Sequence, residues 1–181
     1  MTLKPQQDDP QLLYDSRHLR LVARGRWEFV ERKTGRPAVG IVAITPAQEV
    51  VLVEQHRPPV DQPVIELPAG LAGDIAGSED EALLTAAQRE LLEETGYQAG
   101  RWTSLGFGYS SPGLTSESIQ LYLAEELERV APGGGDETEQ ITVHLVPLDQ
   151  VIPWLSGRGA DLKLMAGLFL AMETIRQREA P

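Results

Sequence analysis

Short runs of apolar and β-branched residues, separated by turn-forming residues, recur along most of the chain. Runs of this kind are typical of β-strands. Two of them, AVGIVAIT and EVVLVEQH, are rich in β-branched residues and are bounded by turn residues around Pro46, which predicts two strands. The predicted strands cover residues 18–24, 27–32, 38–45, 49–56, 64–67, 102–109, 117–125 and 141–148.

Helical periodicity is clearest in the middle of the chain. Leu84, Ala87 and Leu91 recur at positions i, i+3 and i+7, which predicts a helix over residues 81–95. Gly96 follows where a C-terminal cap belongs. Two further helices are predicted over residues 149–156 and 162–178, with Asp161 as the N-cap of the last, and loops over residues 71–80 and 131–138.

The order of these elements favours a mixed α/β or α+β sandwich over a regular parallel βαβ series, because strands dominate and the helices lie between and after them. The length of 181 residues suits one domain with a real core. We therefore expect a single domain over residues 18–178, preceded by a loosely ordered segment over residues 1–17.

Charge and composition narrow the classes of function. The net charge is −11, and an acidic chain repels nucleic acid, so we expect no nucleic-acid partner. The chain has no cysteine, which excludes a thiolate nucleophile and a Cys-based zinc site. It has no apolar run of membrane-spanning length, and its N-terminus lacks an apolar signal core, so no membrane partner and a cytoplasmic location are expected.

The segment RELLEETG at residues 89–96 places three carboxylates close together. Glu90, Glu93 and Glu94 fall within roughly 100° of one another on a helical wheel, beside the apolar stripe. Carboxylates crowded in this way repel each other unless a positive charge lies among them, and a hard divalent cation with oxygen ligands is one solution. A solvated acidic helix face is the alternative. Arg89 is placed to hold one carboxylate through a bidentate ion pair.

The surrounding sequence resembles the signature motif of the Nudix family. ELPAG at residues 66–70, then Glu81, then AAQRELLEETGY at residues 86–97 carry the resemblance. The family pattern is Gly, five residues, Glu, seven residues, and Arg-Glu-aliphatic-x-Glu-Glu-x-Gly-aliphatic. The final aliphatic position is Tyr97 here. Ten residues separate Gly70 from Glu81 instead of five, so Glu79 competes with Glu81 for the first glutamate position.

The resemblance implies an α/β/α sandwich around a mixed β-sheet, with an antiparallel β extension at the N-terminus. It also implies that Glu90, Glu93, Glu94 and the backbone carbonyl of Ala69 bind metal ions, Mg²⁺ first and Mn²⁺ as a substitute. In that reading Glu94 and Arg89 belong to the catalytic apparatus. The implied reaction is attack of water on a phosphorus atom of a diphosphate.

Other segments resemble the ADP-ribose pyrophosphatase branch of this family. EQHRPP at residues 54–59 is similar to the branch's Gln-x-Arg-Pro segment, so Arg57 is expected to contact the diphosphate, as suits an arginine fork. Glu66 and Leu71, on either side of the PAG turn, are further candidates for substrate binding.

WEFVER at Trp27–Arg32 resembles the segment where relatives stack the adenine on a tryptophan. Trp27, Glu28 and Arg32 are therefore candidates for binding the base, with a core aromatic as the alternative for Trp27. SSPGLTSE at residues 110–117 is similar to a loop near the terminal ribose, although Pro-Gly alone is ordinary turn chemistry. Relatives are usually homodimers that exchange N-terminal strands, which places residues 18–37 in a dimer contact.

A general base is expected on the loop before the last predicted strand. Related enzymes carry a catalytic glutamate there, and a loop that closes over substrate brings it to the attacking water. Glu137 and Glu139 are both eligible, with Glu139 ahead of Glu137, and an ordinary acidic turn is the alternative for each.

The resemblance therefore implies Mg²⁺-dependent hydrolysis of a nucleoside diphosphate sugar, ADP-ribose to AMP and ribose 5-phosphate first. Another sugar nucleotide, such as GDP-mannose or ADP-glucose, is the alternative substrate. A module that binds ADP-ribose without cleaving it is the alternative class.

Overall fold

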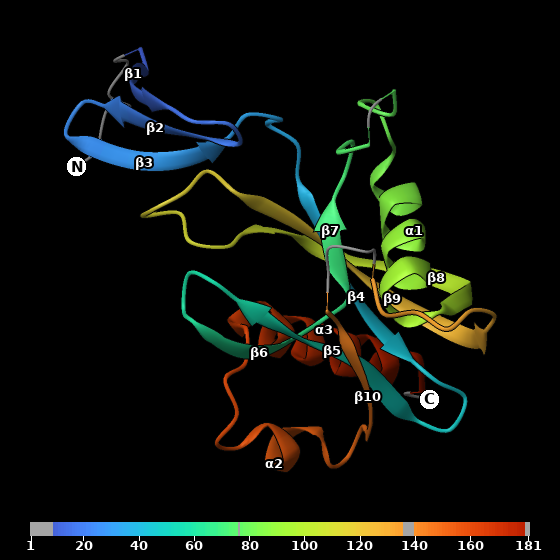
Figure 1. Cartoon of the computed structure of the whole chain (residues 1–181). Coiled ribbons are helices and arrows are strands. Elements are labelled where there is room, and N and C mark those ends of the chain that lie inside the picture. Colours follow the sequence, from blue (N-terminus) through green and yellow to red (C-terminus); the bar gives the residue numbers. More distant parts are fainter. Residues whose placement is uncertain (1–8, 76, 136–139, 180–181) are drawn as a thin grey trace.

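The computed structural model describes residues 9–75, 77–135 and 140–179, which form two β-sheets and three helices. Figure 1 shows the small N-terminal sheet lying apart from the large sheet that carries the helices. The elements are β1 Gln11–Asp15, β2 Leu19–Arg24, β3 Trp27–Arg32, β4 Ala38–Ile44, β5 Glu49–Arg57, β6 Gln62–Glu66, β7 Ala69–Leu71, α1 Leu83–Thr95, β8 Tyr97–Tyr109, β9 Ser118–Arg129, β10 Thr142–Pro147, α2 Val151–Leu155 and α3 Leu162–Glu179.

The large sheet is mixed, with the order β10-β5-β4-β9-β8 and with β6 and β7 paired to β5 and β4. The pair β4 and β9 is parallel, and the other pairs are antiparallel. Strand β4 and residues 50–53 of β5 are buried on both faces, which explains why these stretches are continuously apolar instead of alternating.

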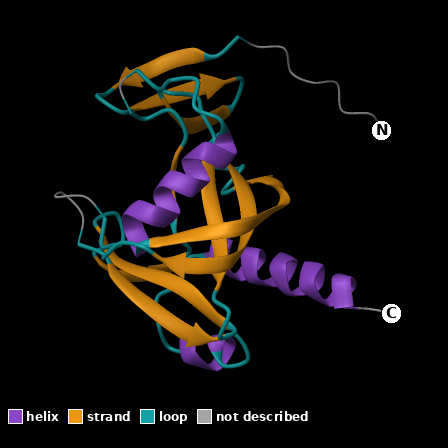
Figure 2. Cartoon of the chain, turned by 90° about the vertical axis from the view of Figure 1, so that its right-hand side faces the viewer, coloured by secondary structure: helices purple, strands orange, loops and turns teal. Residues whose placement is uncertain are grey.

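Alternate residues of β4 build the cores on the two faces of this sheet. Val42 and Ile44 pack in a cluster with α2 and α3, whereas Val39, Ile41 and Ala43 pack in a cluster with α1. Figure 2 shows α1 and α3 on opposite sides of the strands. The predicted α/β/α sandwich around a mixed sheet is therefore present.

The three-stranded antiparallel sheet β1-β2-β3 is the N-terminal extension. It is joined to the loop before β9, because the backbone N–H of Val30 donates to the carbonyl of Leu114 at 2.9 Å. The expectation of a loosely ordered segment over residues 1–17 is wrong for Gln11–Asp15. Those residues form β1 through pairing with β2, and this order comes from a neighbour that the local sequence does not reveal.

Several boundaries differ from the predicted ones. The first helix begins at Leu83 rather than at residue 81, and no side chain caps its N-terminus. Gly96 ends it in the left-handed conformation, as predicted. The strand β8 begins directly afterwards at Tyr97, and the short strand β7 replaces part of the predicted loop. None of the helices in the described ranges has the length and apolar character needed to cross a bilayer.

Candidate functional site

A cleft of about 1000 Å³ lies among β4, β6, β7, α1 and the start of α3. Among the described residues it is lined by seven acidic and four basic side chains, so its wall is negative overall. The acidic residues are Glu66, Asp74, Glu90, Glu93, Glu94, Glu117 and Asp161, and the basic residues are Arg32, Arg57, Arg89 and Lys163.

Helix α1 supplies the three carboxylates of the sequence motif to this cleft. Its apolar residues pack on the sheet, and this fixes the direction in which Glu90 and Glu94, one turn apart, must point. Glu90 is only 8% exposed and Glu94 only 3%, whereas the side chain of Glu93 is 51% exposed. The interpretation of a solvated acidic face is therefore wrong for Glu90 and Glu94.

Arg89 is the centre of the charge network at this helix. Its guanidinium donates to Glu81 at 3.2 Å, to Glu90 at 2.8 Å, to Glu93 at 3.1 Å and to Asp74 at 3.1 Å. Burial acts to lower the pKa of Arg89, but these ion pairs outweigh burial and raise it. One guanidinium thus faces four carboxylates.

Arg89 also holds the neighbouring turn, because it donates to the backbone carbonyl of Leu71 at 3.1 Å. Leu71 lines the cleft, and its backbone carbonyl accepts this hydrogen bond from Arg89.

Glu81, not Glu79, occupies the first glutamate position of the motif. Its carboxylate accepts from Arg89 and from the backbone N–H of Gly73, at 3.1 Å for the latter, while Glu79 accepts locally from Gly77. The hydrogen bonds with Arg89 hold the pKa of Glu81 below its ordinary value against the opposing effect of burial. The extra residues of the motif are accommodated between Gly73 and Glu81, so the spacing changes while the ion pair remains.

The turn before β7 is fitted closely to the glutamates of α1. The backbone N–H of Ala69 donates to Glu94 at 3.0 Å. At Gly70 there is no room for a side chain, because an added Cβ would collide with the carboxylate of Glu90. Gly70 therefore creates the space that Glu90 fills.

Burial disfavours the ionised form of Glu90, although Arg89 pairs with it. Loss of water raises the pKa of Glu90 to about 7, and the opposing attraction of Arg89 does not restore the ordinary value. A second positive charge near Glu90 would stabilise its ionised form.

Arg57 and Glu66 form a bidentate pair in the same cleft as the α1 glutamates. The two guanidinium nitrogens lie 2.5 and 2.7 Å from the carboxylate oxygens, and Glu66 is buried. The hydrogen bond with Glu66 raises the pKa of Arg57 further. Because the Arg57 side chain remains 42% exposed, a fixed guanidinium faces the cleft near Glu94.

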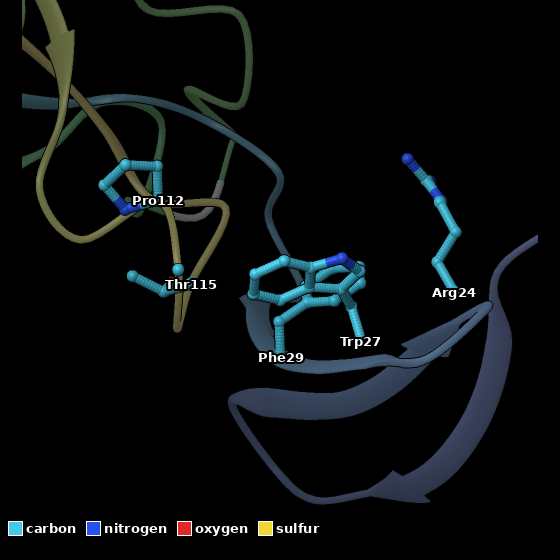
Figure 3. Close-up of a pocket in the computed structure, with 6 residues that line it drawn as sticks. Arg24, Trp27, Phe29, Pro112 and Thr115 are labelled. Atoms are coloured by element: carbon cyan, nitrogen blue, oxygen red, sulfur yellow. The ribbon is translucent and has the colours of Figure 1, made fainter. Parts of the chain in front are cut away.

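Trp27 lines a different pocket. It is 54% exposed, which makes the interpretation as a core aromatic wrong. Figure 3 shows Trp27 beside Phe29 on β3, with Pro112 and Thr115 of the loop before β9 across from them. This pocket has a volume of about 310 Å³ and also includes Arg24 and Gly113. The structure of one chain therefore does not bring Trp27 into the cleft of the α1 glutamates, and Glu28 lines neither space.

Arg32, at the other end of β3, does line the large cleft. Its guanidinium donates to Glu117 at 2.9 and 3.0 Å. Glu117 ends the segment that resembles a loop near the terminal ribose, whereas Asp161 and Lys163 are cleft residues that the sequence motifs miss. They come from the loop before β9 and from the start of α3, and no local spacing connects them with α1.

Glu137 and Glu139 lie outside the described residues. The segment before them is fixed to the end of α1, since Gly134 donates to the backbone carbonyl of Glu94 at 2.8 Å and Gly135 to that of Glu93 at 3.1 Å. Gly133 packs so closely that an added Cβ would strike the backbone at Thr95. Residues 133–135 are therefore attached to the end of the carboxylate helix α1.

A model of the NUDIX domain matches residues 34–166, which is most of the chain. The chain belongs to the Nudix family.

Among curated relatives, the ADP-ribose pyrophosphatase of Bacillus subtilis (strain 168) is 35% identical over 122 residues, 67% of this chain and 63% of that protein. The ADP-ribose pyrophosphatase of Mycobacterium tuberculosis is 39% identical over 112 residues, 61% of this chain and 52% of that protein. The GDP-mannose pyrophosphatase of Citrobacter koseri is 34% identical over 139 residues, 72% of this chain and 69% of that protein. The chain thus matches less than two thirds of the length of either ADP-ribose pyrophosphatase.

The crystal structure of an ADP compounds hydrolase has the same fold, with a TM-score of 0.75 over 97% of this chain and 98% of that one at 22% identity. The predicted Nudix fold is therefore confirmed.

Nudix hydrolases generally use divalent metal ions, and the donor chemistry of the cleft fits such an ion. Buried carboxylates at Glu90 and Glu94 are hard oxygen ligands, and at Glu90 the effect of burial on the pKa outweighs the attraction of Arg89. In the described ranges no three acidic or histidine side chains already converge on one point. An ion held by one or two carboxylates, with waters and phosphate oxygens, is the arrangement that Mg²⁺ commonly adopts.

The close fit at Gly70 gives a test of the Nudix site. In the Gly70→Ala variant the new methyl group displaces the Glu90 carboxylate, so we expect Mn²⁺ affinity, measured by electron paramagnetic resonance, to fall by about 10- to 100-fold. Gly108→Ala is the control, because an added Cβ there meets nothing within 4 Å. Equal Mn²⁺ affinity for wild type and Gly70→Ala would exclude Glu90 as a ligand.

Proposed function

We propose that this Nudix protein hydrolyses the diphosphate bond of a nucleoside diphosphate sugar, with ADP-ribose as the first substrate and AMP and ribose 5-phosphate as products. The observation that carries this proposal is the juxtaposition of buried Glu90 and Glu94 with the fixed guanidinium of Arg57 in one cleft. A diphosphate needs both a cation site and a fork-shaped donor, and this cleft offers both.

In the proposed reaction, the oxygen of a water molecule forms a bond to one phosphorus while the bridging P–O bond breaks. The proton of the water passes to a general base, and the second phosphate leaves. Arg57 orients the diphosphate, because its pair with Glu66 fixes the guanidinium plane. Arg89 keeps Glu90 and Glu93 in place, so it acts as a positioning residue. A bound Mg²⁺, or Mn²⁺ in its place, would polarise the phosphate and lower the pKa of the water.

The general base in this proposal is Glu139, with Glu137 as the alternative. Support comes from the nearby glycines Gly134 and Gly135, whose backbone N–H groups donate to the carbonyls of Glu94 and Glu93 at the end of α1.

GDP-mannose is the second candidate substrate. The relative named GDP-mannose pyrophosphatase from Citrobacter koseri aligns over 72% of this chain, more than the ADP-ribose pyrophosphatases do. Hydrolysis of ADP-ribose, ADP-glucose and GDP-mannose with Mg²⁺, and after its removal by chelation, distinguishes these substrates. Binding of ADP-ribose without hydrolysis of any of the three would favour the non-catalytic module.

We also propose a homodimer that uses the N-terminal strands, in the cytoplasm. Leu12, Tyr14 and Trp27 of the small sheet are 54%, 65% and 54% exposed, so this sheet carries apolar surface that a second copy would cover. Analytical ultracentrifugation tests the dimer, and a monomer at micromolar concentration would contradict it.

Replacing Glu94 tests the metal site through activity. Because a glutamine oxygen can still accept from the N–H of Ala69, Glu94→Gln should fold normally. We expect kcat for ADP-ribose to fall by about three orders of magnitude, since loss of metal-assisted stabilisation costs several kcal/mol. Glu128→Gln makes the same change in charge at an exposed position and should retain activity. Near-normal turnover of Glu94→Gln would remove Glu94 from the site.

The identity of the base is tested by two variants in the same assay. Glu139→Gln should lower kcat by about 10²- to 10⁴-fold with little change in KM, as expected for loss of a general base. Glu137→Gln should retain most of kcat. The reverse result would assign the base to Glu137.

The role of Trp27 is tested by comparing two equally exposed aromatic residues. Loss of base stacking costs about 1–3 kcal/mol, so Trp27→Ala should raise KM for ADP-ribose by about tenfold or more. Phe107 is 55% exposed and lines neither the large cleft nor the pocket of Trp27, so Phe107→Ala is the control variant. If both variants leave KM unchanged, Trp27 does not bind the base.

A further inference from the structure

The connector between the small sheet and the large sheet holds both ends of the loop that lengthens the Nudix motif in this chain. Residues 33–37 lead from β3 to β4 (Figure 1), and the loop lies between β7 and α1. At the start of the loop, the backbone N–H of Ala72 donates to the carbonyl of Pro37 at 3.3 Å. At its end, the guanidinium of Arg36 donates to the backbone carbonyl of Glu81. Two adjacent residues of the connector therefore fix the loop.

The loop also closes on itself and reaches the charge network of α1. The backbone N–H of Gly73 donates to the carboxylate of Glu81 at 3.1 Å, and an added Cβ at Gly73 would collide with the backbone carbonyl of Glu79. The next residue, Asp74, accepts from Arg89 at 3.1 Å. The loop therefore supplies one of the four carboxylates that share Arg89, and its placement matters to the other three.

Arg36 reaches the carboxylates of α1 through two further residues. Glu81 accepts from both Nε and Nη2 of Arg89, each at 3.2 Å. Through Nη1, Arg89 in turn donates to Glu90 at 2.8 Å and to Glu93 at 3.1 Å. The side chains of Glu81 and Arg89 are only 8% and 17% exposed, so water cannot easily replace these hydrogen bonds. The position of Glu81 therefore determines how Arg89 holds the carboxylates of α1.

The contacts of Arg36 favour the placement of Glu81 over simple stabilisation of the fold. The Nε of Arg36 is buried, and among the described residues no atom accepts a hydrogen bond from it. A buried donor without an acceptor lowers stability. Hydrogen bonds with Arg89 are the main cause that lowers the pKa of Glu81, and the charge of Arg36 acts in the same direction. Arg36 thus helps to keep Glu81 ionised as the partner of Arg89.

We propose that Arg36 is a positioning residue for the carboxylates of α1, which it holds in place through Glu81 and Arg89. The order of these carboxylates then depends on the connector from the small sheet, which lies outside the Nudix motif. The inference rests on the proposed function, since it concerns the carboxylates that are proposed to bind the metal ion.

The affinity for Mn²⁺ distinguishes positioning from the effect of charge. Arg36→Met removes the donor and one positive charge and keeps an unbranched side chain. Loss of a positive charge alone would strengthen the binding of a cation, whereas loss of positioning should weaken it. We expect Mn²⁺ affinity, measured by electron paramagnetic resonance, to fall by about 3- to 10-fold. Arg36→Lys, which keeps a charged donor, should recover part of the loss.

Arg158→Met is the matched control. Arg158 also donates to a backbone carbonyl, that of Trp154, but it does not line the large cleft. This variant should bind Mn²⁺ as wild type does. A lower melting temperature of Arg36→Met with an unchanged or higher Mn²⁺ affinity would overturn the inference, because Arg36 would then only stabilise the fold.

The Nε–H group of Arg89 provides a second measurement that needs no metal ion. It donates to Glu81, and the exchange of its proton with water, followed by NMR, reports how often this bond opens. In the metal-free protein, Arg36→Met should speed this exchange by about threefold or more, and Arg158→Met should leave it unchanged. Equal exchange in wild type and Arg36→Met would overturn the inference.

The two measurements separate this inference from the proposed function. If wild type binds no Mn²⁺, the proposed metal-dependent hydrolysis fails, and the exchange at Arg89 alone decides the role of Arg36. If wild type binds Mn²⁺ but hydrolyses no nucleoside diphosphate sugar, the proposed substrate class fails, and both measurements still decide that role. Faster exchange in Arg36→Met supports the inference in either case, and unchanged exchange overturns it.

Discussion

The arrangement of the site depends on the ion pairs between Arg89 and four carboxylates. Without Arg89, Glu81, Glu90, Glu93 and Asp74 would bring four negative charges together around one end of a partly buried helix. The guanidinium can bind several of them at once because it has five N–H donors in a fixed plane. It also donates to the carbonyl of Leu71, so the same side chain connects α1 with β7. One cation among four anions still leaves the helix negative, and that remaining charge is what makes the site suitable for a metal ion.

The packing of α1 on the sheet determines where this charge cluster lies. Strand β4 divides its side chains between two cores, and α1 packs on one of them through small residues, Ala86 and Ala87, that are completely buried. Small residues allow the helix to approach the sheet closely. Glu90 and Glu94 are then carried into the cleft instead of outward to solvent, and Gly70 leaves the room that Glu90 requires. The packing that buries the apolar residues of α1 therefore also directs its acidic residues into the cleft.

The sequence predicts well those features that depend on short spacings along the chain. The period of Leu84, Ala87 and Leu91 predicts α1, and the position of Arg89 beside the glutamates predicts that it holds a carboxylate, as it does for Glu90 and Glu93. Residues brought together from distant parts of the chain are different. Glu117 and Arg32 are 85 residues apart, and Lys163 reaches the cleft only because the start of α3 is bonded to β6. Strand β1 is missed for the same reason, since its order comes from pairing with β2. Trp27 is a mixed case, because its exposure excludes a core role while its pocket remains separate from the glutamates within one chain.

The charges of the cleft match the diphosphate of the proposed substrate. A diphosphate is strongly anionic, so it can approach the α1 carboxylates only with a cation between them, and Arg57 then supplies a fixed positive group in the same cleft. If the whole cleft were as negative as α1, it would bind cations but repel the diphosphate. Because the excess negative charge is concentrated at α1 and Arg57 is held by Glu66 in the same cleft, cation binding and diphosphate binding can occupy neighbouring parts of it.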